Sequence, residues 1–318
     1  MALTFDRICE AAERIRPYVH RTPVWTNASL NQRIGARVYL KCENFQRAGA
    51  FKFRGACNAV FSLPDDNATR GVCTHSSGNH AQALSLAARM RGVPAYVVMP
   101  GNASRVKIDA AHAYGGRITT CEPTLAARQS AVSEIVERAG ATFVHPYDDA
   151  CVIAGQGTAA LELLTQVPDL DMLIAPVGGG GLLSATALVA AARKNRIRVV
   201  GAEPEGADDA RRSLAAGRII PSTNPSTIAD GLRTSLGELT FPVIHQLVEQ
   251  IVTVSERGIV ESMKFILERA KILIEPSAAV AVASLWEQKV SPMPPTIGVI
   301  LSGGNVDLQE LPWQQATE

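Results

Sequence analysis

Short apolar runs alternate with amphipathic segments along the middle of the chain. The apolar runs are typical of buried strands, and the segments between them repeat apolar residues at helical spacing. The pattern predicts, in order, a strand at 72–74, a helix at 79–90, a strand at 95–99, a helix at 104–114, a strand at 118–121, a helix at 125–139 and a strand at 142–144. Strands that alternate with helices favour a parallel sheet covered on both faces.

A second series of the same kind follows, and a shorter one comes before. The later pattern predicts helices at 155–164, 182–193, 255–270 and 276–288, and strands at 172–177, 197–202, 251–254 and 297–301. The earlier one predicts a helix over 4–19 that Pro17 bends or ends, a strand at 37–42 and a helix at 51–63. Residues 218–240 are rich in Pro, Ser and Thr and predict a less regular segment.

The length of the chain favours two lobes, because 318 residues exceed the usual size of a single hydrophobic core. The predicted fold class is α/β, with parallel sheets covered by helices. We expect a small mobile domain at 71–147, and a large cofactor-binding domain formed by 1–70 together with 148–318. Ligands of open α/β sheets bind at the carboxyl ends of strands, so the turns that follow the predicted strands are where a site is expected.

Composition and charge exclude several classes of function. The net charge is +1 and no Lys/Arg-rich run occurs, which argues against nucleic acid or an anionic membrane as a partner. The first residues show no cationic segment followed by an apolar one, and no apolar stretch is long enough to span a bilayer. The six cysteines are scattered without zinc spacing, as is typical of reduced residues in a cytoplasmic protein.

Lys52 stands between Phe51 and Phe53 at the predicted start of a helix. Apolar neighbours strip water from an ammonium, which disfavours its charged form and makes the nucleophilic amine easier to reach. Such an amine can form a Schiff base with an aldehyde cofactor. The alternative is a lysine whose stem packs on a helix surface while its charge stays in water, and Lys52 alone does not decide between the two.

Four consecutive glycines, Gly178–Gly181, separate a predicted strand from a predicted helix. Glycine amides can approach an anion closely, and the helix N-terminus adds a favourable potential. We therefore predict a phosphate cradle. A dinucleotide-binding fingerprint is the rival interpretation, because Gly179-x-Gly181-x-x-Ser184 nearly fits and Glu203 ends the next predicted strand.

Three other stretches carry polar side chains where a strand is predicted to end. Residues 76–80 can bind a carboxylate through Ser and Asn side chains and through amides at a helix start, with ordinary N-capping as the alternative. Ser302 can face a heteroaromatic nitrogen or belong to a plain turn. The loop at 203–209 concentrates carboxylates and free carbonyls, which hard divalent cations bind, with a solvated acidic loop as the alternative.

Together these stretches resemble the fold type II pyridoxal 5′-phosphate enzymes, close to serine racemase and the serine/threonine dehydratases. The resemblance runs from about Ile15 to Asp307, and it implies a two-lobed fold like that of the tryptophan synthase β chain. Its specificity comes from the order and placement of the matching segments. They are Lys41-Cys-Glu-Asn-Phe-Gln, Phe51-Lys-Phe-Arg-Gly-Ala, Ser76-Ser-Gly-Asn-His, Val152-Ile-Ala-Gly-Gln-Gly-Thr, Gly178–Gly181 and Ser302-Gly-Gly-Asn.

The resemblance implies a cofactor role for each matching residue. Lys52 would hold the cofactor and then act as the base on the substrate Cα–H. Phe51 would pack against the cofactor ring, and Asn79 would hydrogen-bond its phenolic oxygen. Ser302 would face the pyridine nitrogen, where a neutral hydroxyl does not stabilise a pyridinium and so suits β-elimination over transamination. The phosphate would be bound by Gly178, Gly179, Gly180 and Gly181.

The resemblance also implies substrate and metal sites. The substrate carboxylate would be held by Ser76, Ser77, Asn79 and His80. Ser77 would also be a catalytic acid/base on the face opposite Lys52. A structural divalent cation, Mg²⁺, Ca²⁺ or Mn²⁺, would be bound by Glu203, Asp209 and the carbonyl of Ala207. Arg128 is a candidate partner for a second substrate carboxylate, with a solvated helix arginine as the alternative.

These expectations describe a cytoplasmic pyridoxal-phosphate dehydratase that converts a β-hydroxy amino acid, of serine, threonine or 3-hydroxyaspartate type, to a 2-oxo acid and ammonium. An amino-acid racemase on the same scaffold is the nearest alternative, and a nicotinamide-dependent dehydrogenase is a remote one. We expect a homodimer that takes a small-molecule substrate. Ala50 and Ala81 depart from the family pattern, where Ser and Gly are common, and this leaves the substrate preference open.

Overall fold

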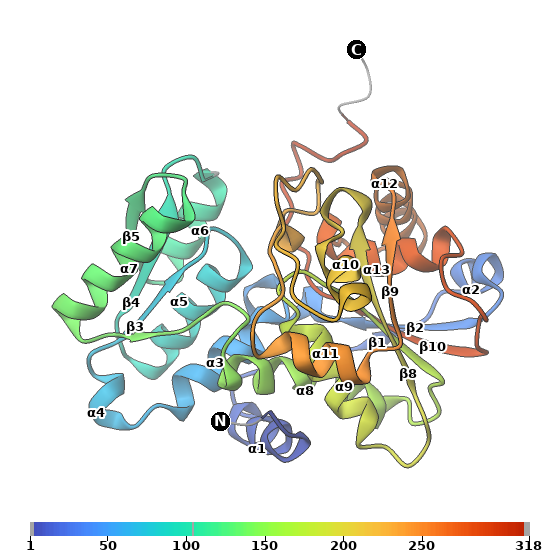
Figure 1. Ribbon diagram of the computed structural model, residues 1–318, viewed down its shortest axis with the longest axis horizontal. Helices are drawn as coiled ribbons and strands as arrows, with labels where there is room; N and C mark the ends of the chain where they lie inside the picture. The colour runs from blue at the N-terminus through green and yellow to red at the C-terminus, as the bar shows by residue number, and fades with distance from the viewer. Residues whose placement is uncertain (1–2, 104, 315–318) are drawn as a thin grey trace.

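The computed structural model describes residues 3–103 and 105–314, which form two β-sheets surrounded by helices (Figure 1). The larger sheet has six strands in the order β1-β2-β10-β7-β8-β9. Their bounds are β1 Val24–Trp25, β2 Arg37–Cys42, β7 Met172–Pro176, β8 Arg198–Pro204, β9 Gln250–Val254 and β10 Thr296–Leu301. All neighbours pair in parallel except β1, which is antiparallel to β2. The expectation of parallel sheets covered by helices is confirmed, and β1 adds a two-residue antiparallel edge that is too short to leave a sequence pattern.

Alternate residues of the central strands face two separate hydrophobic cores. Met172 and Ile174 of β7 belong to one core, whereas Leu173 and Ala175 belong to the other. The first core is closed by helices α2, α12 and α13, and the second by α1, α8, α9 and α11. The period of two places helices on both faces of the sheet, as the alternating pattern predicts.

The helices outside residues 72–143 begin and end within a few residues of the predicted positions, and several further ones occur. They are α1 Phe5–Ile15, α2 Ala28–Ile34, α3 Lys52–Ser62, α4 Asp65–Ala68, α8 Ala150–Gln166, α9 Gly181–Ala191, α10 Asp209–Ala216, α11 Thr240–Leu247, α12 Glu256–Phe265 and α13 Pro276–Trp286. Short 3₁₀ segments are η1 Glu43–Phe45, η2 Arg47–Gly49, η3 Glu205–Ala207 and η4 Asp230–Leu232, and a π-helical turn, η5 Ile266–Ala270, continues α12.

The smaller sheet has four parallel strands in the order β5-β4-β3-β6 and lies with its helices on the left of Figure 1. Its elements are β3 Val72–His75, α5 Asn79–Arg91, β4 Ala95–Pro100, α6 Arg105–Ala113, β5 Gly116–Cys121, α7 Leu125–Ala139 and β6 Thr142–Phe143. Every one of these elements lies within 72–143. The domain boundaries at 71 and 147, and the mobility of the small domain, stay predictions.

Two predicted helix ends differ from the observed ones for identifiable reasons. Helix α1 stops at Ile15 and does not reach 19, because Pro17 has no amide hydrogen to continue the ladder. Helix α8 starts at Ala150, earlier than predicted, because the carboxylate of Asp149 caps it by accepting from the amides of Cys151 and Val152. Within residues 3–103 and 105–314, no helix is both long enough and apolar enough to cross a membrane.

Helices α3 and α8 pack closely, and this contact fixes the position of Lys52. A Cβ on Gly155 would lie 2.4 Å from the carbonyl oxygen of Arg54, and a Cβ on Gly55 would lie 2.7 Å from that of Val152. Only glycine at both positions lets the two backbones approach this far. The first turn of α3, which begins at Lys52, is thereby held at the carboxyl ends of the large sheet's strands, beside Ser302 at the end of β10.

Candidate active site

Lys52 is half-buried, and its amine contacts protein atoms. The Nζ atom donates a hydrogen bond of 2.7 Å to the carbonyl oxygen of Pro146 and lies 5.2 Å from the centre of the Phe51 ring. Burial lowers the pKa of Lys52 to about 8, against the opposing effect of the Glu275 carboxylate. A large fraction of this amine is therefore unprotonated in mildly alkaline solution. Such an amine is a nucleophile and a base.

The glycine run is joined to Lys52 through the segment that contains Pro146. The ring of Tyr147 covers Gly179 so closely that a Cβ there would lie 2.2 Å from ring carbons. Gly180 has φ of 88°, a conformation that residues with a side chain rarely adopt. Within the described residues, the amides of Gly178, Gly179 and Gly180 donate to no protein acceptor. These free donors, at the N-terminus of α9, form a cradle for an anion.

Ser302 and Asn79 are connected to the region around Lys52 by hydrogen bonds through Phe51 and Asn305. The amide of Phe51 donates to the carbonyl oxygen of Ser302 at 2.9 Å, which places the buried Ser302 next to the start of α3. Asn305 links η2 to the start of α5, since its Nδ2 donates to the carbonyl oxygen of Ala48 at 2.8 Å and to Oδ1 of Asn79 at 2.9 Å. The structure thus brings together residues from three distant parts of the sequence.

Glu275 is a site residue that the sequence pattern did not single out. Its carboxylate is 7% exposed and accepts from Nδ2 of Asn79 at 2.8 and 3.0 Å. Burial raises the pKa of Glu275 to about 7. The available signal was a single carboxylate between the apolar run Ile272-Leu-Ile and Pro276, a place where apolar residues are otherwise expected.

Three histidines, His75, His80 and His145, lie near the segment whose Pro146 carbonyl accepts a hydrogen bond from Lys52. Nδ1 of His145 accepts from the amide of Asp148 at 2.8 Å, and burial lowers the pKa of His145 to about 4. Burial and the nearby Lys52 charge hold the pKa of His80 well below its usual range, and burial also lowers that of His75. The His80 ring is buried, with Nε2 3.4 Å from the carbonyl oxygen of Val144. This leaves the amide at the start of α5, rather than the neutral ring, as the part of His80 suited to a substrate carboxylate.

The other predicted substrate residues lie around the carboxyl end of β3. Ser76 and Ser77 are half-buried in the loop before α5, and Oγ of Ser76 accepts from the amide of Gly78 at 3.3 Å. Arg128 is half-buried on α7, and its Nε donates to the carbonyl oxygen of Thr124 at 3.3 Å. Its positive charge lowers the pKa of His75 and opposes the rise in that of Tyr147. The guanidinium is therefore close to the same cluster of rings.

Glu203 lies near the end of β8 and Asp209 begins α10, close enough for the charge of Asp209 to raise the pKa of Glu203. Glu203 accepts from the amides of Ala210 and Arg211 at 3.1 and 2.7 Å, and Oδ2 of Asp209 is buried without a partner. Burial, aided by the neighbouring carboxylates, raises the pKa of Glu203 to about 8 and that of Asp209 to about 6. No group of three or more His, Cys, Asp or Glu side chains arranged for a metal occurs in residues 3–103 and 105–314.

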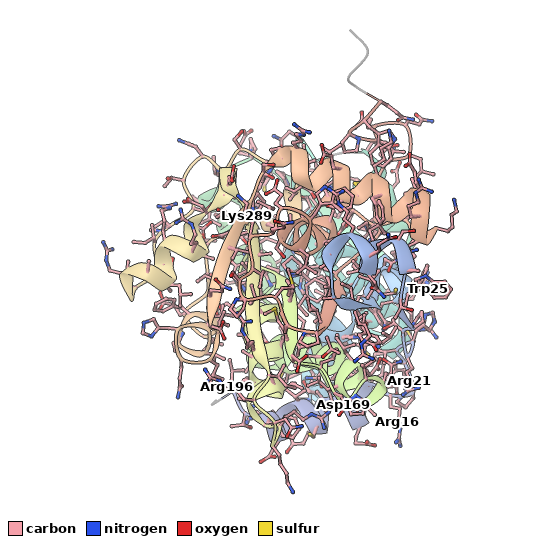
Figure 2. The ribbon with its side chains drawn as sticks, turned by 90° about the vertical axis from the view of Figure 1, so that its right-hand side faces the viewer. Arg16, Arg21, Trp25, Asp169, Arg196 and Lys289 are labelled. Carbon is pink, nitrogen blue, oxygen red and sulfur yellow. The ribbon has the colours of Figure 1, made fainter. Side chains whose placement is uncertain are left out.

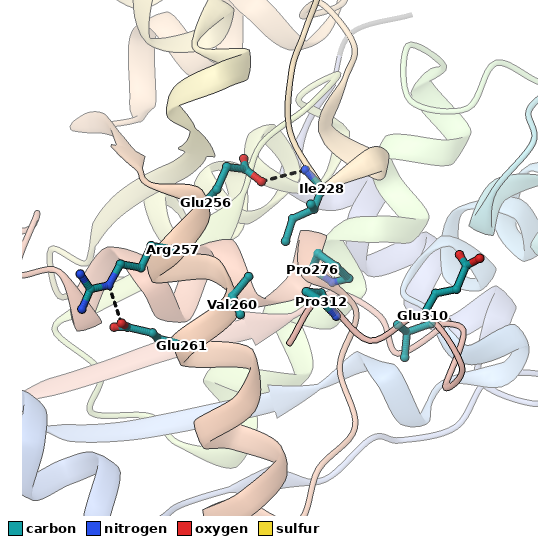
Figure 3. A pocket seen from close by; sticks show the side chains of 9 residues that line it. Ile228, Glu256, Arg257, Val260, Glu261, Pro276, Glu310 and Pro312 are labelled. Atoms are coloured by element: carbon teal, nitrogen blue, oxygen red, sulfur yellow. Dashed lines mark hydrogen bonds and ion pairs between the residues drawn. The ribbon is translucent and has the colours of Figure 1, made fainter. Parts of the chain in front are cut away.

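An open cavity of about 610 Å³ lies apart from the predicted site residues, between α12 and the segment 306–312 (Figure 3). Pro276 on its wall follows Glu275 directly in sequence, but no residue of the predicted site lines this cavity. The lining residues are Ile228, Glu256, Arg257, Val260, Glu261, Pro276, Val306, Glu310 and Pro312.

Comparison with known proteins agrees with this geometry. Residues 15–303 match the family described as "Pyridoxal-phosphate dependent enzyme". The chain belongs to this family. The chain is 49% identical to a serine racemase of Arabidopsis thaliana over 96% of this chain and 93% of the relative. It is 48% identical to a beta-hydroxyaspartate dehydratase of Paracoccus denitrificans over 98% of each. A crystal structure of a threonine deaminase from T.th. superposes with a TM-score of 0.91 at 42% identity, over 96% of this chain and 99% of that one.

The residues at the site fit pyridoxal 5′-phosphate. The unbonded amides of the glycine run suit its phosphate, and the lowered pKa of Lys52 favours the neutral amine that can form a covalent link to an aldehyde. The fold type II architecture is confirmed by the superposed structure. The nicotinamide alternative is not supported, because both carboxylate oxygens of Glu203 already accept hydrogen bonds from amides of α10 and are not free for a ribose.

Proposed function

We propose that this protein is a pyridoxal-phosphate-dependent dehydratase that converts a β-hydroxy amino acid to a 2-oxo acid and ammonium. The observation that carries the proposal is the placement of the half-buried Lys52, whose amine donates to the Pro146 carbonyl, next in sequence to the Tyr147 ring that covers Gly179. The 48% identity to a beta-hydroxyaspartate dehydratase supports the reaction type. The relatives named above carry different activities at nearly equal identity, so sequence identity alone does not distinguish the possible substrates.

When bound, pyridoxal phosphate withdraws electrons from the substrate Cα and thereby acidifies its proton. Lys52 supplies the covalent attachment and, once released, takes that proton through its neutral amine. The carbonyl of Pro146 holds the Lys52 amine in place. The glycine amides would hold the phosphate, and Ser302 would offer the pyridine nitrogen a hydroxyl group that carries no negative charge.

The N-terminus of α5 positions the substrate carboxylate. Ser76 and Ser77 precede this helix, and the first amides of the helix, at Asn79 and His80, have no intrahelical acceptor. Asn79 contributes to both cofactor and substrate. Ser77 is the candidate acid/base on the face opposite Lys52.

We further propose 3-hydroxyaspartate as a substrate class, with Arg128 as the partner of its second carboxylate. The guanidinium lies close enough to His75 and Tyr147 to affect their pKa values, and these rings belong to the cluster around Lys52. A planar guanidinium can bind a carboxylate through two parallel hydrogen bonds. Serine and threonine offer no such group, so they gain nothing from this contact.

An assay with a panel of substrates tests the reaction. Serine, threonine and 3-hydroxyaspartate are each incubated with the loaded enzyme, and 2-oxo acid and ammonium are measured. Stoichiometric release of both products supports a dehydratase. Neither product from any of the three would refute the proposal.

Racemisation is a second candidate, favoured by the 49% identity to a serine racemase. A racemase must return a proton to the opposite face of Cα, where we place Ser77. Chiral analysis of the serine remaining in the assay measures it directly. Ser77→Ala should abolish any such racemisation while retaining more of the elimination, because only racemisation needs the second face.

We propose that Glu203, Asp209 and the Ala207 carbonyl bind a divalent cation that supports the fold. Oδ2 of Asp209 is buried without a partner, and burial raises the pKa values of both carboxylates because it disfavours their charged forms. A bound Mg²⁺, Ca²⁺ or Mn²⁺ would supply a countercharge. Treatment with a chelator should lower the melting temperature by a few degrees, since a ligand of the native state is lost. An unchanged melting temperature, with or without added cation, would contradict the site.

We propose a cytoplasmic homodimer. All six cysteines are free thiols, in keeping with a reducing compartment. Trp25 and Phe45 are about half exposed, at 50% and 49%, and Trp25 projects from the edge of the molecule (Figure 2). Exposed aromatic residues are enriched at protein interfaces. Sedimentation analysis of the parent and of Trp25→Ser measures the oligomeric state, and a monomeric parent would contradict the proposal.

A further inference from the structure

Glu275 is a buried carboxylate to which the mechanism above gives no task. It occupies the N-cap position of α13, yet its side chain makes no capping hydrogen bond. Both carboxylate oxygens lie instead within hydrogen-bond distance of Nδ2 of Asn79, at 2.8 and 3.0 Å. A negative side chain is stabilised near a helix N-terminus, so the turn of this carboxylate away from the α13 amides and toward Asn79 is a specific arrangement.

The contacts of Asn79 determine which way its amide faces. The carbonyl of Ala48 accepts from Asn305 at 2.8 Å, which identifies Nδ2 of Asn305 as the atom on that side. The same Nδ2 lies 2.9 Å from Asn79, so it must meet the Oδ1 atom of Asn79. A carboxylate only accepts, so Nδ2 of Asn79 must face Glu275. One proton of that Nδ2 is then used by Glu275, and the other stays available for a bound ligand.

The backbone leaves room for this carboxylate. A Cβ at Gly303 would lie 2.6 Å from Oε1 of Glu275, so a larger residue would push the carboxylate away. The amide of Glu275 also donates to the carbonyl oxygen of Gly303 at 3.0 Å. The strand end that carries Ser302 therefore also shapes the space for Glu275.

Charged groups face Glu275 from three other elements. Lys52 lies on α3, Lys107 on α6 and Asp230 on η4, and the last two form an ion pair with each other. Burial is the main cause that raises the pKa of Glu275, while the hydrogen bond from Asn79 lowers it and Asp230 raises it. The negative charge of Glu275 in turn raises the pKa of Lys52, against the effect of burial.

We propose that Glu275 is a positioning residue that orients the Asn79 amide toward the cofactor ring and, in its ionised form, adds a negative charge in the vicinity of Lys52. This proposal rests on the proposed cofactor site. Glu275 acts through Asn79 and through the electric field at Lys52, without touching the substrate.

The test uses the full-length protein loaded with pyridoxal phosphate. Two quantities are measured: the dissociation constant of the cofactor, and the pH midpoint of the change in its absorbance. Glu275→Ala removes both the acceptor and the charge, whereas Glu275→Gln keeps an acceptor oxygen and removes only the charge. Glu268→Gln, an exposed glutamate of η5, is the matched control.

Glu275→Ala should weaken cofactor binding about tenfold, because a buried donor loses its charged acceptor. Glu275→Gln should change binding less but lower the pH midpoint by about one unit, since a nearby negative charge no longer favours the protonated nitrogen. In an Asn79→Ala background, Glu275→Ala should no longer weaken binding, while the shift of the midpoint should persist. A role in folding alone would not separate these two effects.

Values for both Glu275 variants that match the control would overturn the proposal, as would an equal loss of binding with and without Asn79. If the Glu275 variants do not fold, Gly303→Ala displaces the carboxylate without removing it and should weaken cofactor binding in the same direction. An unchanged dissociation constant in Gly303→Ala would also overturn it. Borohydride treatment and peptide mapping of the parent tests the cofactor site separately, because cofactor found on no lysine, or on a lysine other than Lys52, refutes the proposed function before any variant is made.

Discussion

Lys52 and Arg54 are two residues apart on α3, and both are taken out of water, but only one of them has anionic partners in hydrogen-bond contact. The guanidinium of Arg54 contacts Glu43 and Glu162 at 2.7 and 2.8 Å. Burial alone would lower the pKa of Arg54, but the two carboxylates outweigh burial and raise the pKa above its usual value. Lys52 has a neutral carbonyl as its hydrogen-bond partner, and its pKa falls to about 8.

The comparison shows that at Arg54 two carboxylate partners outweigh the effect of burial on the pKa, whereas at Lys52 burial is the larger effect. Glu162 also pairs with the buried Lys41 at 2.8 Å, so the region around Arg54 is a network of compensated charges. Such a network holds α3 to α8 and to the segment that follows β2. Lys52, which has no ion-pair partner among the described residues, can lose its proton and form a covalent bond.

The largest effect is expected from Lys52→Ala. It removes both the covalent anchor and the base, so turnover should fall by several orders of magnitude. The melting temperature should stay near that of the parent, because no ion pair is lost. Steady-state oxo-acid release and thermal unfolding measure the two quantities, with Lys264→Ala on the exposed face of α12 as the control. Turnover comparable to that of the control would show that Lys52 is not the reactive lysine.

Arg54→Leu should have the opposite profile. It leaves Glu43 buried without its partner, which should lower the free energy of unfolding by about 3–5 kcal/mol. Urea denaturation of the full chain measures the loss. Replacing Glu43 as well, in Arg54→Leu/Glu43→Leu, should recover much of it, because well-packed apolar residues can substitute for a buried ion pair. A stable Arg54→Leu single variant would mean that the network contributes little.

Arg128 extends the comparison to a cation whose partner would be the substrate. Arg128→Ala should reduce kcat/KM for 3-hydroxyaspartate about tenfold or more, because a charge-assisted contact is lost. Serine and threonine should be affected far less. Equal losses on all three substrates, or no loss on any, would show that Arg128 does not select the side chain.

The pH dependence of cofactor uptake tests the comparison without any substitution. The neutral amine is the nucleophile, and the pKa of Lys52 is lowered to about 8. The rate of uptake should therefore rise about tenfold per pH unit below that value and level off above it, because it follows the neutral fraction. Stopped-flow absorbance with stripped full-length protein records the rate. A midpoint near the ordinary lysine value of about 10.4 would show that the amine is not desolvated.

Much of the fold could be predicted from the sequence, because strand and helix periods depend on local spacing. The runs that became β7, β8 and β10 and the helices between them were evident from apolar periodicity. Helices α10 and α11 and the two-residue β1 were missed, since they are short and held by contacts with distant parts of the chain. Lys52, the glycine run and Ser302 could be singled out because each follows or begins a regular element.

The sequence by itself determined the residue types of the site and their places at strand ends, since these depend on order along the chain. Only the tertiary structure decided which charges would be paired. Arg54 and Lys52 look alike in the sequence, and no local signal tells that Glu162, 108 residues away, pairs with one of them. Glu275 is likewise 196 residues from Asn79. The electrostatic environment of a buried group depends on neighbours that the fold brings together, and a local pattern carries no record of them.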